Sequence, residues 1–208
     1  MPDFVLEAAA RQAGYLIIAG VDEAGRGPWA GPVVAGAAIL KDNNLSEHLR
    51  TGLDDSKKLK PAKRKLLFDL LQAEALTGVG IASVEEIDQL NILQATFLAM
   101  NRAVENLARA PDYLLVDGNR PPKSPYPLEC IIKGDGKSLS IAAASIIAKV
   151  SRDRIMKKLA QKFPGYGWER NAGYGTAEHK QAMERLGVCA EHRKSYAPVI
   201  KMLSLKDS

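Results

Sequence analysis

The hydrophobic pattern of the first forty residues predicts a hairpin of two buried strands. Residues 15–21 form an apolar run rich in β-branched side chains, which ends on Asp22 and Glu23 and a glycine-rich turn. A second apolar run over residues 32–40 follows after a short connection. Because a parallel return needs about a dozen residues or more, we expect the two strands to pair antiparallel, with the two acids at the end of the first strand.

Helical and strand patterns alternate further along the chain. Pro61 suits the first position of a helix that reaches about residue 75, and a strand is predicted over residues 77–83. Apolar residues at spacings of three and four predict a long helix over residues 91–107. The apolar face of the helix that begins at Pro61 is expected to contain Leu66, Leu67, Leu70 and Leu71.

Two more strands and two more helices complete the pattern. A strand over residues 113–116 ends on Asp117, and another is predicted over residues 128–132. A serine at position 138 or 140 caps a helix that extends to about residue 158, and a shorter helix is predicted over residues 177–186. This order predicts an α/β fold, in which a mixed five-stranded sheet is flanked by helices and followed by a small helical C-terminal extension.

The composition fits one main domain without membrane contact. With 208 residues and 46% hydrophobic content the chain can bury one substantial core, and charges interrupt every apolar stretch before it reaches the roughly 20 residues that span a bilayer. The acidic beginning of the chain does not resemble a secretory signal, so we expect a cytoplasmic location, with Cys130 and Cys189 reduced and buried. A net charge of +5 favours polyanionic partners but does not establish one.

Three acids are expected to meet at the end of the sheet. Asp22 and Glu23 end the first strand and Asp117 ends the fourth, so a sheet that places these strands side by side brings their carboxylates together. Clustered carboxylates either bind cations or acquire raised pKa values, and oxygen ligands without histidine or cysteine favour Mg²⁺ or Mn²⁺. The alternative is that each acid merely stabilises a turn, as Asp-Gly pairs often do.

A fourth carboxylate can come from either of two positions. Asp135 stands just before the long helix that begins near residue 138, and Asp153 lies within that helix. Asp153 shares a helix face with Lys149, four positions earlier, and we favour an ion pair between these two side chains. The spacing alone does not choose between the two acids.

The glycine-rich turn beside the acids has two interpretations. Gly25 and Gly27 allow backbone groups to approach the sugar or phosphate of a nucleic acid closely, or they simply permit a tight hairpin turn. Arg26 is then either a phosphate contact or an ion-pair partner of the neighbouring acids. A dinucleotide-binding loop is excluded, because such a loop opens a helix, whereas Pro28 and Pro32 lead into another strand.

Six fragments spread over the chain together resemble the ribonuclease HII family of the bacterial type. In order, they are GVDEAGRGPWAGPVVAGAAIL, LDDSKKL, LLVDG, KGDGKSLSIAAASIIAKVSRD, GYGTAEH and HRKSYAP, and the resemblance extends over about residues 15–199. It implies an RNase H-like catalytic domain over residues 1–160, with a loop and helical extension over residues 161–208 packed on it. It also implies hydrolysis of the RNA strand of RNA–DNA hybrids and cleavage at ribonucleotides embedded in duplex DNA.

The resemblance assigns roles to individual residues. Its acidic catalytic set, which binds Mg²⁺ or Mn²⁺, corresponds to Asp22, Glu23, Asp117 and Asp135. The motif that contacts the 2′-OH at an RNA–DNA junction corresponds to Gly25, Arg26 and Gly27, and the tyrosine that packs on the adjacent sugar corresponds to Tyr174.

The sequence departs from the family pattern in three places. Trp29 stands where an aliphatic residue is usual and Tyr196 where phenylalanine is common, which affects local packing and not the acids. The tail over residues 202–208 lacks the aromatic pair by which some archaeal relatives bind a sliding clamp. We therefore expect no clamp contact through this tail, and separately we expect a monomer.

The resemblance and the acids together suggest a two-metal-ion mechanism. Two ions can activate water, neutralise the phosphate and stabilise the departing oxygen, which gives 5′-phosphate and 3′-hydroxyl ends. His179 and His192 are expected to be hydrogen-bonded structural residues. Candidate phosphate contacts, although charged residues of this kind are usually solvated surface, are Lys57, Lys58, Lys149 and Arg152.

Two rival functions stay open. One is a different polynucleotidyl transferase of the same fold, such as a DNA recombination nuclease, which would cut duplexes that contain no ribonucleotide. The other is a non-catalytic module that binds hybrids without metal-dependent turnover.

Overall fold

Five strands form a single sheet: β1 (Ile18–Ala24), β2 (Val33–Ile39), β3 (Leu76–Ala82), β4 (Tyr113–Asp117) and β5 (Leu128–Ile131). The computed structural model describes residues 1–41 and 45–204. The strand order is β3-β2-β1-β4-β5, with β1 to β3 antiparallel and with β4 parallel to both β1 and β5. The predicted mixed sheet, its hairpin and the parallel fourth strand are confirmed.

The first strand differs from the prediction at both ends. The backbone N–H groups of Leu16 and Ile17 donate to the carboxylate of Asp112, at 2.8 Å each, so this segment satisfies its donors outside the sheet. Leu16 is accordingly 79% exposed. At the other end the strand continues through Asp22 and Glu23, which pair with residues of β2. The two acids therefore lie within regular, rigid backbone and not in a loop after it.

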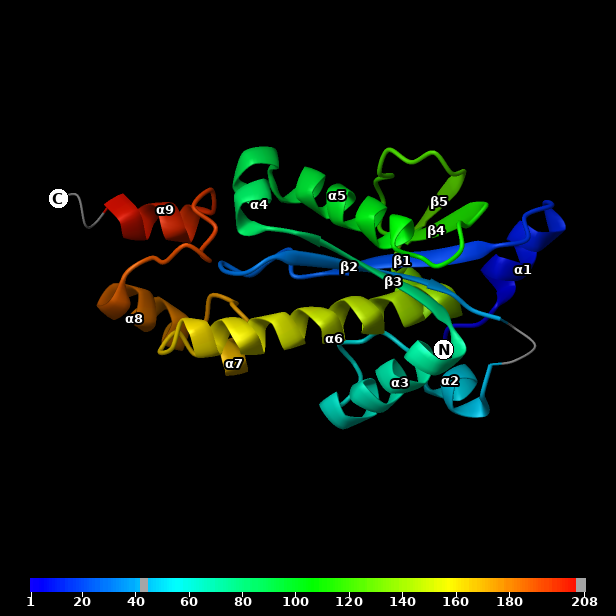
Figure 1. Cartoon of the computed structure of the whole chain (residues 1–208), viewed down its shortest axis with the longest axis horizontal. Helices are drawn as coiled ribbons and strands as arrows, with labels where there is room; N and C mark the ends of the chain where they lie inside the picture. The colour runs from blue at the N-terminus through cyan, green and yellow to red at the C-terminus, as the bar shows by residue number, and fades with distance from the viewer. Residues whose placement is uncertain (42–44, 205–208) are drawn as a thin grey trace.

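Helices cover both faces of the sheet (Figure 1). On one face lies α5 (Ile92–Glu105), and on the other lies α6 (Leu139–Lys162), together with α3 (Pro61–Glu74) and the short α2 (Glu47–Gly52). Apolar side chains fill the space between each helical layer and the sheet. The sheet that carries the acids is thus held from both sides.

The long helix α6 packs unusually close to β1 and β2 because these strands carry glycine where the helix crosses them. A Cβ atom at Gly20 would stand 2.1 Å from the carbonyl carbon of Ser140, and one at Gly36 would stand 2.3 Å from the carbonyl oxygen of Ala144. Ser138 accepts from the N–H of Ile141 and caps the helix, as predicted. The close packing fixes the beginning of α6, and the turn before it, against the strand of Asp22.

The buried face of α3 differs from the predicted one. Leu67 and Leu71 are buried, but Leu66 is 52% exposed and Phe68 takes its place inside. Phe68 lies between the helix and α6, where the guanidinium of Arg154 stacks 4.3 Å from its ring. The prediction for Leu66 is wrong because neighbours in sequence point about 100° apart on a helix, and the aromatic side chain fills the larger space.

Several short helices have no counterpart in the predictions. They are α1 (Val5–Gln12), α4 (Val84–Leu90), α7 (Trp168–Asn171) and α9 (Ala197–Ser204), besides α2. In α4 the side chain of Ser83 and that of Glu86 cap each other's backbone N–H groups. Asn91 then starts α5 with a positive φ of 68° and caps it through its side chain. The predicted helix over residues 91–107 thus corresponds to α5 alone, and α4 precedes it as a separate helix.

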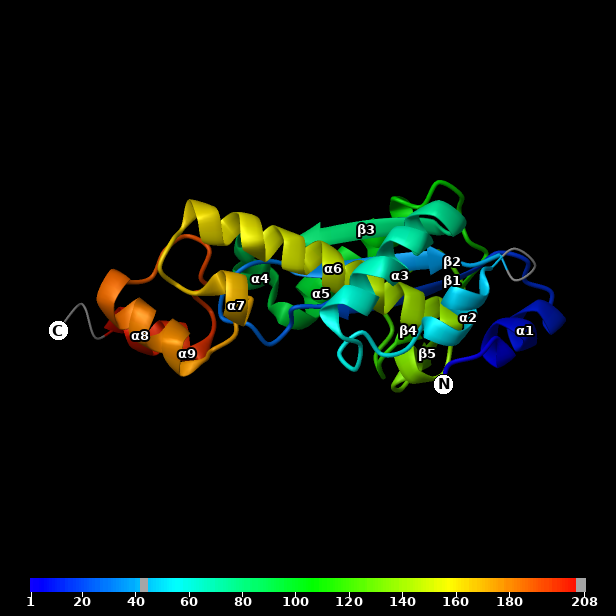
Figure 2. The same ribbon diagram turned by 90° about the horizontal axis from the view of Figure 1, so that it is seen from below.

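The C-terminal helices gather at one end of the molecule, opposite α1 (Figure 2). There α7, α9 and α8 (Ala177–Leu186) surround a small core that includes Trp168 and Met183. The helix α6 continues through residue 160 to Lys162, so it contributes to both parts of the chain. The division at that residue stays a prediction, and residues 205–208 of the tail lie outside the described residues.

His179 and His192 belong to this C-terminal core. Both are fully buried, their Nε2 atoms are 3.1 Å apart, and the indole N–H of Trp168 donates to His179 at 3.0 Å. Burial, followed by the proximity of His179, lowers the pKa of His192 to about 4. The predicted structural role of the histidines is confirmed.

Cys130 and Cys189 are free thiols, as predicted, but they are half-buried and not fully buried.

Candidate active site

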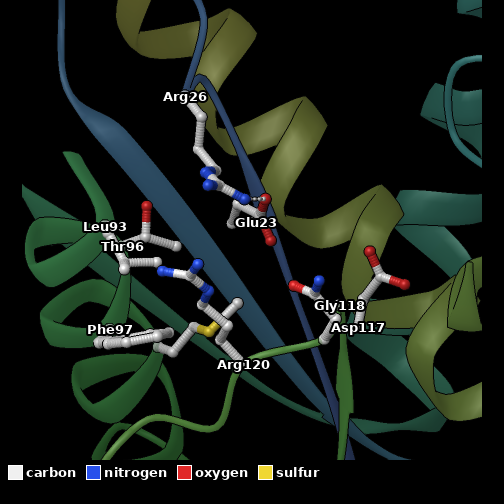
Figure 3. Close-up of a pocket in the computed structure, with 10 residues that line it drawn as sticks. Glu23, Arg26, Leu93, Thr96, Phe97, Asp117, Gly118 and Arg120 are labelled. Carbon is white, nitrogen blue, oxygen red and sulfur yellow. Dashed lines mark hydrogen bonds and ion pairs between the residues drawn. The ribbon is translucent and has the colours of Figure 1, made fainter. Parts of the chain in front are cut away.

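Asp22, Glu23 and Asp117, the acid cluster, meet where β1 and β4 lie side by side. The parallel register pairs Val21 with Val116, which brings the residues that follow them next to each other. One carboxylate oxygen from each acid lies within 4.8 Å of the others. Figure 3 shows Glu23 and Asp117 rising from the two strands beside a common space. The juxtaposition expected from the sequence is confirmed.

The acid cluster is short of positive charge. Burial, followed by the charges of Glu23 and Asp117, raises the pKa of Asp22 well above its ordinary value, although hydrogen bonds from the Glu23 N–H and Ser145 oppose this. Burial likewise raises the pKa of Glu23, against the lowering effect of Arg26, whose guanidinium lies 3.4 Å away. Three carboxylates held so close fit a divalent cation of the Mg²⁺ or Mn²⁺ type, which would offset their repulsion.

Asp135 lies beside the acid cluster but is not one of its three members. It sits in the 3-10 turn η2 (Gly134–Gly136) just before α6, and the N–H of Gly134 donates to Asp117 at 2.6 Å. Burial, and after it the charges of Asp55 and Asp117, raise the pKa of Asp135. The turn therefore holds Asp135 within electrostatic range of the cluster.

Asp153, the other candidate for the fourth carboxylate, is engaged in an ion pair within α6. Asp153 accepts from Lys149 at 2.6 Å, which is the helical ion pair that the spacing predicted.

The sequence did not single out Asp55, whose charge acts on both Asp135 and Lys57. Burial lowers the pKa of Lys57, but the charges of Asp22, Asp55, Asp135 and Glu23 outweigh it and raise the pKa overall. The only sequence signal for Asp55 is its place in the fragment LDDSKKL.

A cleft of about 350 Å³ opens beside the acid cluster and is called here the glycine cleft. Tyr174, which is 45% exposed, lies next to Gly27, where an added Cβ would be 3.6 Å from its ring. Lys58 is not a lining residue, and its ammonium lies 3.4 Å from Asp54. Most of the predicted substrate residues do line the cleft, namely Gly25, Arg26, Gly27, Lys57, Lys149 and Tyr174.

Arg152 was proposed as a phosphate contact, and this prediction is wrong. Its side chain is 1% exposed and donates to the carbonyl oxygens of Pro32, Ala172 and Ala30. Lying behind Gly25, it ties the hairpin turn to the C-terminal part of the chain. A charged residue in a basic helix was interpreted as surface, whereas here it serves as a buried donor to backbone carbonyls.

Arg193, in the fragment HRKSYAP, was not singled out by the sequence. It is 0% exposed and donates to the carbonyl oxygens of Gly25 at 2.6 Å, Arg26 at 2.9 Å and Gly31 at 2.9 Å. The hydroxyl of Tyr196 donates to the same Arg26 oxygen at 2.5 Å. These bonds fix the carbonyl side of the turn, so Tyr196, where the family commonly has phenylalanine, adds a contact to it.

The other departure from the family pattern, Trp29, also packs against the turn that carries Tyr174. A Cβ atom at Gly175 would stand 2.1 Å from the indole ring, and the ring centroid of His179 lies 5.8 Å away. Trp29 therefore packs against the residue next to Tyr174. It is not one of the residues of the acid cluster.

Comparison with known proteins identifies the family of this chain. The family model described as Ribonuclease HII matches residues 19–199. The chain belongs to the ribonuclease HII family. It is 57% identical to the Ribonuclease HII of Ruegeria pomeroyi over 203 residues, which covers 97% of this chain and 85% of that protein. It is 56% identical to the Ribonuclease HII of Paramagnetospirillum magneticum, with coverage of 98% and 99%.

Solved structures agree with this assignment. The ribonuclease H2 of Pyrococcus horikoshii matches with a TM-score of 0.77 and 30% identity, covering 93% of this chain and all of that one (100%). The RNase HII of Archaeoglobus fulgidus, in a structure of its complex with PCNA, matches with a TM-score of 0.69 and 27% identity, covering 87% and 95%. A Bst-RNase HIII in complex with Mn²⁺ matches with a TM-score of 0.75 at 21% identity, covering 95% and 72%, and shows the shared fold.

Membership in the ribonuclease HII family establishes the class of activity. The chain is a metal-dependent endoribonuclease that acts on RNA in hybrids with DNA, and its fold is the RNase H-like fold that the resemblance implied. Among residues 1–41 and 45–204, none of the helices has the length and apolar character to cross a membrane.

Proposed function

We propose that this ribonuclease HII cuts at single ribonucleotides embedded in duplex DNA as well as in longer hybrids, by a two-metal-ion mechanism. The observation that carries the proposal is the arrangement of the acid cluster and the glycine cleft, which share Glu23, with the guanidinium of Arg26 in the cleft 3.4 Å from that carboxylate. A phosphate at the cluster would then have a sugar in the cleft beside it. Cleavage would leave a 5′-phosphate and a 3′-hydroxyl.

The acid cluster would hold the metal ions, with Asp135 contributing from the turn before α6. Divalent ions supply charge neutralisation at the phosphate and lower the pKa of water. The protein keeps the ligands in place through rigid elements, since Asp22 and Glu23 lie in β1 and the N–H of Gly134 orients Asp117. Mg²⁺ and Mn²⁺ both suit this set of oxygen ligands.

The glycine cleft would recognise the ribose. The 2′-OH distinguishes RNA from DNA at a given sugar, so a selective enzyme must contact it. Gly25 has a positive φ of 99°, and with its carbonyl oxygen bound by Arg193 the turn is fixed for close approach of a sugar. Tyr174 would pack on the sugar next to it, and Lys57 and Lys149 would contact phosphates, with affinity that falls as salt rises.

Replacing Tyr174 with alanine is expected to lower cleavage at a single embedded ribonucleotide by about tenfold to a hundredfold, the range of one lost stacking contact. Tyr174→Phe should retain most of the activity, because it keeps the ring. Tyr15→Ala is a matched control, since the ring of Tyr15 packs against that of Tyr113 before the beginning of β1, away from the cleft, with centroids 4.4 Å apart. Steady-state rates on one duplex test this, and equal rates for Tyr174→Ala and the parent would refute the sugar contact.

Three duplexes of one sequence test the proposed function against a DNA nuclease of the same fold. One is DNA alone, one carries a single ribonucleotide and one is a full RNA–DNA hybrid. With Mg²⁺ we expect cleavage of the second and third and none of the first, and with EDTA no cleavage of any. Cleavage of the DNA duplex at a comparable rate would support the rival nuclease, and binding of the hybrid without turnover would support a non-catalytic module.

The cytoplasmic location and the monomeric state stay predictions.

A further inference from the structure

A second cleft, of about 250 Å³, shares Glu23 and Arg26 with the glycine cleft but is lined by residues of α5, which covers the opposite face of the sheet from the α6 residues that line the glycine cleft. It reaches the acid cluster as well, because Glu23 and Asp117 are among its lining residues. Figure 3 shows its side chains. We call it the Arg120 cleft. Beyond the acids it is lined by Leu93, Phe97, Met100, Asn119 and Arg120.

Arg120 places a positive charge in this cleft. It lies three residues after Asp117, the last residue of β4, and its side chain extends across the cleft toward α5 (Figure 3). It is exposed, and within the described part of the chain no hydrogen bond or ion pair occupies it. Arg26, by contrast, lies 3.4 Å from Glu23. The charge of Arg120 is therefore available to an anion that enters beside the acid cluster.

The opposite wall of the Arg120 cleft is apolar. Leu93, Phe97 and Met100 come from successive turns of α5, and Leu93 and Phe97 remain partly exposed there. The cleft thus combines a cation, the amide of Asn119 and an apolar surface next to the phosphate site. A nucleotide has the matching chemistry, since it joins an anionic phosphate to a sugar and a base with an apolar face.

We propose that the Arg120 cleft binds the nucleotide on the 5′ side of the bond that is cut, with Arg120 contacting the phosphate one step further upstream. This inference rests on the proposed function. If the ribose in the glycine cleft keeps the 5′-phosphate after cleavage, its nucleotide lies on the 3′ side of that bond. The neighbour on the other side of the phosphate must then leave the acid cluster in the opposite direction, where the Arg120 cleft lies.

The reaction defines what this nucleotide becomes. Water oxygen forms a bond to phosphorus, and the bond between phosphorus and the 3′ oxygen of the upstream nucleotide breaks. The departing oxygen takes up a proton, so the nucleotide in the Arg120 cleft is released with a 3′-hydroxyl. Holding it in place would fix the direction of the leaving group relative to the attacking water.

Arg120→Ala, compared with Arg109→Ala, tests the proposal. Arg109 is exposed and precedes β4, whereas Arg120 follows it, so the two variants remove the same charge from opposite ends of the strand. The substrates are two duplexes with one ribonucleotide, and in one of them the phosphate one step upstream of the cleaved bond is a neutral methylphosphonate. The readouts are KM, kcat and the dependence of KM on salt.

On the normal duplex, Arg120→Ala should raise KM by about tenfold and reduce the slope of log KM against log salt by about one, as expected for one lost phosphate contact. On the methylphosphonate duplex, the parent should show a similarly raised KM and Arg120→Ala should add nothing to it. Arg109→Ala should behave as the parent on both. Two results would overturn the proposal. One is a KM for Arg120→Ala equal to that of the parent on the normal duplex, and the other is a KM that Arg120→Ala raises on the methylphosphonate duplex by the same factor as on the normal one.

Failure of the proposed function gives a different result. In that case the parent itself does not cut on the 5′ side of the ribonucleotide, whatever Arg120 does. The proposal for the Arg120 cleft would then fall with it. If the parent cuts there and the variants do not separate, the function stands and the Arg120 cleft is not an upstream subsite.

Discussion

Asp117→Asn is expected to lower kcat for Mg²⁺-dependent cleavage by at least about a thousandfold, which corresponds to about 4 kcal/mol of transition-state stabilisation. Asparagine has the same shape and retains an oxygen that can accept from the Gly134 N–H. In the parent this N–H donates to the Asp117 carboxylate at 2.6 Å. The change therefore removes a charge from the acid cluster with little effect on its geometry. Retention of full Mg²⁺-dependent activity would contradict the assignment of Asp117.

Thermal unfolding separates the loss of metal binding from a loss of structure. Without metal, Asp117→Asn should be at least as stable as the parent, because one of three mutually repelling carboxylates has gone. Addition of Mg²⁺ should raise the melting temperature of the parent and do so much less for the variant. Asp69→Asn is the matched control, since Asp69 is an exposed acid on α3 with a side chain that is 51% exposed. It should respond to Mg²⁺ as the parent does.

Arg193→Met is expected to lower the free energy of unfolding by about 3–5 kcal/mol, because it leaves buried carbonyl oxygens without a donor. Those of Gly25 and Gly31 lose the guanidinium, which is 0% exposed, whereas that of Arg26 loses it but keeps the hydroxyl of Tyr196. Urea titration of the parent and the variant gives the difference. Lys194→Met, at an exposed neighbouring position, should change stability little and serves as the control.

A second variant separates stability from substrate recognition. Arg193→Lys keeps the charge but cannot donate to three carbonyls in a fixed fork. We expect it to fold, with a raised KM for the duplex that carries one ribonucleotide, because the turn over Gly25 to Gly27 is less fixed. A stability for Arg193→Met within about 0.5 kcal/mol of the parent, the range of ordinary surface substitutions, would contradict the buried role of Arg193.

The parts of the fold that were predictable from the sequence depend on local patterns. The hairpin followed from two apolar runs and a short turn, and the acid cluster followed once β1 and β4 were assumed to be neighbours. The spacing also predicted the pair of Lys149 and Asp153, since residues four apart on a helix share a face. In the hairpin and the ion pair, residues close in sequence carried the information, whereas the acid cluster also required that assumption about the strand order.

The parts that were missed depend on contacts between distant segments. Arg152 and Arg193 have the residue type of a surface contact, and only the folded chain places carbonyl oxygens around them. Asp55 acts on Asp135 from a position 80 residues earlier. The short helices α1 and α9 have too few turns for their periodicity to stand out, and tertiary packing stabilises them.

The most direct test of the account is to map the cut on a DNA duplex that carries one ribonucleotide in the presence of Mg²⁺. The account predicts a single cut on the 5′ side of the ribonucleotide, with a 5′-phosphate on the ribonucleotide and a 3′-hydroxyl on the fragment upstream. End-labelling of both fragments determines the position and the chemistry of the ends. A cut on the 3′ side, a 3′-phosphate end, or cleavage independent of the ribonucleotide would contradict it.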